Sequence, residues 1–65
     1  MTPTPDAIKA ARLRLGWTQA KCAKIAGYGQ PGRWNELERG VRSISPERWQ
    51  LFLHRAGLEK IPFYG

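Results

Sequence analysis

Apolar residues recur at helical spacing in four short stretches, and residues that start or end helices separate these stretches. The first stretch puts Ile8, Ala11 and Leu15 on one face, between Thr4 and Gly16. Threonine caps helix N-termini, and a glycine after the last turn ends helices. The spacing therefore predicts a helix over residues 5–15.

The second stretch follows Thr18, another candidate N-cap, and ends before Gly27. Its apolar stripe consists of the small residues Cys22, Ala23 and Ala26. This pattern predicts a helix over residues 19–26 that a neighbouring helix can approach closely.

The third stretch begins at Pro31, since proline is favoured at the first position of a helix. Trp34, Leu37 and Val41 form its apolar face, and Gly40 is the stop signal. We expect a helix over residues 31–39. Its opposite face is polar and carries Gly32, Arg33, Asn35, Glu36 and Arg39.

The fourth stretch begins at Ser45 and Pro46 and stops at Gly57. It has the spacing i, i+3, i+4, i+7 in Trp49, Phe52, Leu53 and Ala56. This stripe predicts a helix over residues 46–56. The remaining residues, 58–65, are apolar but interrupted by proline, so we expect an extended tail.

These elements predict one all-α domain spanning residues 1–65, with four helices in a compact fold and an extended C-terminal tail. A chain of 65 residues lies near the lower limit for a core that lacks metals and disulfides. Large apolar side chains should therefore be structural. We expect the core to be anchored by Trp17, Trp34 and Trp49.

The chain is strongly basic, with 11 Lys and Arg against 5 Asp and Glu and a net charge of +6. Such a field attracts polyanions. A charge of this size is also ordinary for a soluble protein. Charge alone therefore leaves nucleic-acid binding and simple solubility equally open.

Candidate catalytic and metal-binding groups are few. One cysteine, Cys22, and one histidine, His54, exclude an internal disulfide framework and argue strongly against a conventional zinc site. We expect no enzyme activity, no metal, no cofactor and no small-molecule ligand. The N-terminus lacks a basic region followed by an apolar run, and no segment has the length of a membrane span, so we expect a cytoplasmic protein.

Two short helices joined by a tight glycine-containing turn are typical of a helix-turn-helix unit. The segment Ile8-Lys9-Ala10-Ala11-Arg12-Leu13-Arg14-Leu15-Gly16-Trp17-Thr18-Gln19, followed later by Leu37-Glu38-Arg39-Gly40, resembles the Cro and phage-repressor (Xre-like) helix-turn-helix family. The distance between these motifs is one residue longer than in the family, and we assign the extra residue to the turn around Tyr28-Gly29. Cys22 replaces a leucine that the family prefers, and Gly32 is unusual within a recognition helix.

The resemblance implies a lambda-repressor-like fold, and it implies roles for two pairs of residues. Thr18 and Gln19, at the start of the second helix, are expected to meet a DNA phosphate, as the N–H groups of a helix N-terminus allow. Thr18 has an alternative role as an ordinary N-cap, and both roles can hold. Arg12 and Glu38 are expected to form a structural salt bridge between the first and third helices.

The third helix would read bases, because arginine pairs with guanine, asparagine or glutamine with adenine, and glutamate with cytosine. The expected base contacts are Gln30, Pro31, Gly32, Arg33, Asn35 and Glu36. The expected phosphate contacts in the following connection are Arg39, Arg42 and Ser43. The alternative for the helix is a solvated polar face.

The implied function is a sequence-specific regulator of transcription that binds double-stranded DNA, a repressor of phage or mobile-element type in the cytoplasm of a bacterial or phage-infected cell. Small domains usually read an inverted-repeat operator as homodimers. The expected dimer interface is Leu58, Ile61, Phe63 and Tyr64, and the alternative is that the tail packs on its own domain. A protein-interaction module, such as an antitoxin or adaptor, remains the rival function. RNA binding is disfavoured because these units suit the major groove of B-DNA.

Overall fold

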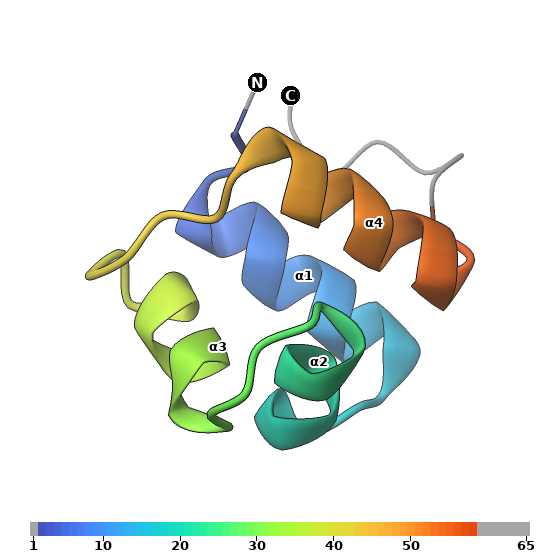
Figure 1. Ribbon diagram of the computed structural model, residues 1–65, viewed down its shortest axis with the longest axis horizontal. Coiled ribbons are helices and arrows are strands. Elements are labelled where there is room, and N and C mark those ends of the chain that lie inside the picture. The colour runs from blue at the N-terminus through green and yellow to red at the C-terminus, as the bar shows by residue number, and fades with distance from the viewer. Residues whose placement is uncertain (1, 59–65) are drawn as a thin grey trace.

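The chain forms four α-helices, α1 (Pro5–Leu15), α2 (Gln19–Ile25), α3 (Gly32–Glu38) and α4 (Pro46–Ala56), in a computed structural model that describes residues 2–58 (Figure 1). No strand occurs in this described part of the chain. The all-helical class is therefore confirmed, and α1 and α4 have the expected bounds. None of these helices is long and apolar enough to cross a membrane.

Three helices begin at a side-chain cap. The hydroxyl oxygens of Thr4, Thr18 and Ser45 each accept a hydrogen bond, from the backbone N–H of Ala7, Lys21 and Arg48 at 3.1, 3.1 and 3.2 Å. Each of these bonds satisfies an N–H that has no partner within its helix. Local sequence signals therefore set the starts of α1, α2 and α4.

The helices predicted over residues 19–26 and 31–39 are both longer than the observed α2 and α3. Ala26 is the C-cap of α2 and not a helical residue. Pro31 occupies the N-cap of α3, where it has no side-chain oxygen to offer, and the helix starts at Gly32. Its first turn is closed by a backbone bond from the Arg33 N–H to the Gln30 carbonyl at 3.2 Å. Arg39 is the C-cap rather than a residue within the helix.

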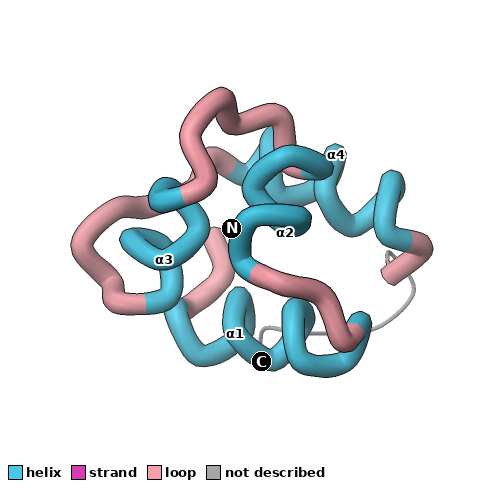
Figure 2. Tube along the Cα trace, turned by 90° about the horizontal axis from the view of Figure 1, so that it is seen from below, coloured by secondary structure: helices cyan, strands magenta, loops and turns pink. Residues whose placement is uncertain are grey.

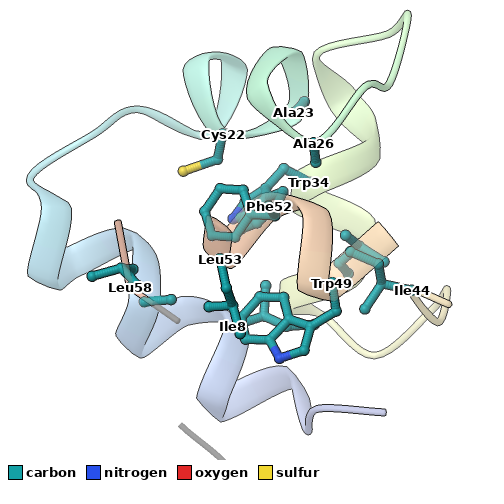
Figure 3. Packing of buried hydrophobic residues seen from close by; sticks show 12 residues of the cluster. Ile8, Cys22, Ala23, Ala26, Trp34, Ile44, Trp49, Phe52, Leu53 and Leu58 are labelled. Carbon is teal, nitrogen blue, oxygen red and sulfur yellow. The ribbon is translucent and has the colours of Figure 1, made fainter. Parts of the chain in front are cut away.

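Aromatic rings of α3 and α4 meet in the core (Figure 3), and a third part of the chain adds Trp17 at its edge. Phe52 of α4 contacts the ring of Trp34 at a centroid distance of 4.7 Å and stacks on Trp49 at 5.6 Å. The half-buried Trp17 meets Phe52 edge-on at 6.5 Å. Trp34 and Trp49 are fully buried as expected, so α4 joins its own core residues to those of α3.

The helices are arranged so that α2 lies between α3 and α4 and contacts both (Figures 1 and 2). Cys22, Ala23 and Ala26 are buried, and these small side chains let α2 pack closely on α3 and α4. In the connection between α2 and α3, residues 26–31, the chain turns without a further helix. The two short helices are therefore supported by α1 and α4.

Two arginines of α4 fix the end of α2. Arg48 Nη1 donates to the Ala26 carbonyl at 2.8 Å, and Arg55 Nη1 donates to the Ile25 carbonyl at 3.0 Å. The Arg48 guanidinium also lies 4.7 Å from the centre of the Tyr28 ring. A Cβ added at Gly27, where φ is +90°, would lie 2.8 Å from Arg48 Nη1. The turn therefore needs glycine for its backbone conformation, and a larger residue there would also displace the Arg48 guanidinium.

Leu58 is a core residue of its own chain, so at this position the structure favours the alternative in which the tail packs on its own domain. Gly57, at φ +75°, turns the backbone after α4, and the Leu58 N–H donates to the Leu53 carbonyl at 2.8 Å. This arrangement directs the Leu58 side chain onto the helix, where it is 5% exposed. The other expected interface residues lie outside the described residues: Ile61, Phe63 and Tyr64.

Val41 does not belong to the apolar face of α3, contrary to expectation. The helix ends at Glu38, and Gly40 at φ +77° reverses the chain before Val41. Helical spacing no longer applies beyond that point, and the Val41 side chain is 66% exposed.

Candidate nucleic-acid interface

The outward face of α3 is polar because its two apolar side chains point inward. Trp34 and Leu37 are fully buried, whereas Arg33, Asn35 and Glu36 are partly exposed. Three further residues at the start of the helix are exposed, and all three are base contacts expected from the sequence: Gln30, Pro31 and Gly32. This face therefore combines hydrogen-bond donors and acceptors on a rigid element.

Arg12 and Glu38, for which the resemblance implies a salt bridge, form a bidentate pair. Arg12 Nε donates to Glu38 Oε2 at 2.6 Å, and Arg12 Nη2 donates to Oε1 at 3.1 Å. The two side chains are 18% and 6% exposed. Burial pushes the pKa of Glu38 upward, but hydrogen bonds from Arg12 and Gln19 outweigh burial and keep this pKa below its ordinary value. The pair joins α1 to the end of α3.

Gln19 connects this pair to the outward face of α3. Its Nε2 donates to Glu38 Oε1 at 3.3 Å, and its Oε1 accepts from Asn35 Nδ2 at 3.4 Å. Both ends of the Gln19 side chain are therefore engaged within the protein. The chain of bonds from Arg12 through Glu38 and Gln19 to Asn35 fixes the orientation of an asparagine on the candidate recognition face. Sequence reasoning missed this link.

Glu36 forms ion pairs with two arginines on the outward face. Its Oε1 accepts from Arg33 Nη1 and from Arg42 Nε, both at 3.1 Å. These hydrogen bonds lower the pKa of Glu36 from its ordinary value, so its carboxylate is ionised at neutral pH. The Arg33 contact follows from i, i+3 spacing on a helix and could have been foreseen. The Arg42 contact could not, because it depends on how the chain turns after α3.

The connection after α3 lies against the same helix. The Glu36 backbone carbonyl accepts from the N–H groups of Val41 at 3.0 Å and Arg42 at 3.4 Å. Figure 1 shows this connection, residues 39–45, extending past the end of α3. The three expected phosphate contacts within it are all exposed: Arg39, Arg42 and Ser43.

The start of α2, the outward face of α3 and the connection after α3 thus form one continuous surface, joined through the contacts of Gln19 and Glu36. Thr18 lies at the edge of this surface as an N-cap, and the Lys21 ammonium sits 4.5 Å from the centre of the Trp17 ring. Residues 18–43 contain five Lys and Arg against two Glu, a net charge of +3. We refer to this surface as the α3 face.

Other chemistry is sparse in the described part of the chain. No group of three or more His, Cys, Asp or Glu residues lies close enough to bind a metal there. Cys22 is fully buried, and burial raises the pKa of its thiol to about 11. The thiol is therefore protonated at neutral pH and shielded from solvent.

Comparison with known proteins gave no match: no family model fits the chain, and no curated protein or solved structure is significantly similar to it. Functional inference therefore rests on the geometry and chemistry of the α3 face.

Proposed function

We propose that this protein is a sequence-specific regulator of transcription that binds double-stranded DNA, with a lambda-repressor-like fold in which α2 and α3 form a helix-turn-helix unit. In this proposal α3 enters the major groove, and the protein acts as a repressor on an inverted-repeat operator.

The observation that carries the proposal is the composition of the α3 face. Arg33, Asn35 and Glu36 project from one side of a short helix whose other side is fully buried. Arginine pairs with guanine O6 and N7, asparagine with adenine N6 and N7, and glutamate with cytosine N4. A helix with these three side chains can therefore distinguish bases by hydrogen bonding. Asn35 is already oriented by Gln19, which favours recognition over a freely solvated surface.

The residues around α3 suit the DNA backbone. The start of α2, with Thr18 and Gln19, lies beside α3, and Arg39, Arg42 and Ser43 follow α3. Contacts of this kind on both sides of a recognition helix set its register in the groove. Gln30, Pro31 and Gly32 precede the helix as further base contacts, and a Cβ at Gly32 would meet no atom within 4 Å, so the backbone there is open to a close approach.

We also propose that the protein binds as a homodimer. One domain of this size contacts only a few base pairs, and two half-sites supply the discrimination that a genome demands. Since Leu58 is buried, an interface formed by described residues would use the outer side of α4, where Leu51 is 40% exposed.

Selection from random duplex DNA, followed by sequencing, tests the proposal. We expect an enriched inverted repeat with half-sites about 10–10.5 base pairs apart, or a multiple of that distance. Repeating the selection with Arg33→Ala should change the preferred bases, whereas Arg39→Ala should weaken binding to all sequences equally. Absence of any enriched sequence would contradict the proposal and favour the interaction-module alternative.

A further inference from the structure

The two glutamates of α3 occupy different environments although they are two residues apart. The Glu38 side chain is 6% exposed and paired with Arg12. The Glu36 side chain is 29% exposed on the outward face, where an approaching DNA would meet it. Glu36 therefore sets a negative charge in the middle of an otherwise basic surface.

Glu36 also forms ion pairs with two arginines that are proposed to contact DNA. Arg33 and Arg42 both bond to the same carboxylate oxygen at 3.1 Å. Arg33 is a proposed base contact and Arg42 a proposed phosphate contact. In the free protein, therefore, one carboxylate competes with DNA for both guanidinium groups.

We infer that Glu36 is a specificity-determining residue that suppresses binding to non-operator DNA by retaining Arg33 and Arg42, an inference that rests on the proposed function. An ionised carboxylate only accepts hydrogen bonds. Cytosine N4 and adenine N6 offer a donor in the major groove, whereas guanine and thymine present acceptors there. At the operator, a base amino group bonds to Glu36 and the two arginines are released to DNA. On other sequences, release of the arginines would leave the carboxylate facing acceptors or phosphates without a donor.

The test compares Glu36→Gln with the matched control Glu47→Gln. Glu47 is exposed in the first turn of α4, so its substitution removes the same charge outside the α3 face. Glutamine keeps the size of the side chain at both positions. Fluorescence anisotropy would measure affinity for a random-sequence duplex and for the selected operator over a range of salt concentrations, and thermal melts would check folding.

We expect Glu36→Gln to raise affinity for the random duplex by about ten-fold, the lower part of the range for one base contact, without raising affinity for the operator. The slope of log affinity against log salt on the random duplex should steepen by about 0.9, the contribution of the one phosphate that the released Arg42 would contact. Glu47→Gln should change both affinities by the same small factor and leave both slopes unchanged. A purely structural role for Glu36 would not steepen a salt slope.

If Glu36→Gln raises both affinities by the same factor as Glu47→Gln, only net charge matters and the inference is overturned. That result would leave the proposed function intact, because the wild-type protein would still select its operator. A wild-type protein that binds neither duplex would overturn the proposed function, and the inference with it.

Discussion

Substitution of Arg12 by methionine gives the sharpest test of how the fold is held together. Methionine preserves much of the aliphatic stem of Arg12 and removes its guanidinium group. Glu38 then keeps a side chain that is 6% exposed but loses its two strongest hydrogen bonds, those of 2.6 and 3.1 Å. The hydrogen bond from Gln19, at 3.3 Å, would be left to stabilise the carboxylate.

The expected loss of stability is large for a protein of this size. Breaking a buried ion pair by removing one partner costs about 3–5 kcal/mol. Because Arg12 is 18% exposed, we expect a value near the lower end, about 3 kcal/mol. Domains of this length have a total free energy of unfolding of about 3–10 kcal/mol. The melting temperature should therefore fall by roughly 12–24 °C.

Thermal and urea denaturation followed by circular dichroism would measure this loss. Arg14→Met is the matched control, because Arg14 is an exposed arginine of the same helix, and its effect should stay within about 0.5 kcal/mol. The double variant Arg12→Met with Glu38→Gln should recover part of the loss, with a coupling energy of about 1–3 kcal/mol. Strict additivity of the two substitutions would refute the reasoning.

In Arg12→Met, the effect of acidification on the free energy of unfolding should be opposite to its effect in the wild type. In the wild type the pKa of Glu38 lies below its ordinary value, so its contribution is complete above about pH 4.3 and is lost as pH falls through the lower pKa of the folded state. In Arg12→Met, burial without the arginine raises the pKa of Glu38, and acidification from about pH 6 towards about pH 4 should recover stability. Melting curves that shift in parallel over this range would contradict the assignment.

Three further predictions concern recognition, the turn and the core. Gln19→Ala frees the side-chain amide of Asn35, so a repeated selection should show a relaxed preference at the base that Asn35 reads. Arg48→Met leaves the Ala26 carbonyl without its 2.8 Å donor and should lower the free energy of unfolding in urea by about 1–2 kcal/mol. Cys22, with a buried thiol whose pKa is about 11, should react with a thiol reagent at neutral pH only when the protein opens, at a rate that rises with urea.

Local signals in the sequence predicted most of the helices. Thr4 and Ser45 cap α1 and α4 through bonds that span three residues, and Gly16 and Gly57 end them, so their bounds were correct. At α3 the same reasoning failed by one residue at each end, because Pro31 has no side-chain oxygen and the first turn is closed through the backbone instead.

Contacts between distant residues could not be read from spacing. Arg12 and Glu38 are 26 residues apart and were paired only through a family resemblance. The bonds from Gln19 to Asn35 and from Arg48 to Ala26 require the helices to be packed first. Leu58 was assigned to an interface because an apolar tail suggests one, and only the turn at Gly57 shows that its side chain covers the core.

The two glutamates of the seven-residue helix α3 have different roles: Glu38 contributes to stability of the fold, and Glu36 is proposed to contribute to recognition of DNA. Glu38 faces α1 and α2, so neutralising it should weaken the fold, and it should affect recognition only through the link from Gln19 to Asn35. Glu36 faces outward and bonds to exposed arginines, and surface ion pairs of this kind contribute little to stability. Neutralising Glu36 should therefore leave the melting temperature nearly unchanged while it alters the choice of DNA. Both substitutions remove one carboxylate from the same helix, so they change the net charge equally. A loss of stability in one variant and a change in DNA preference in the other would therefore follow from the direction in which each side chain points.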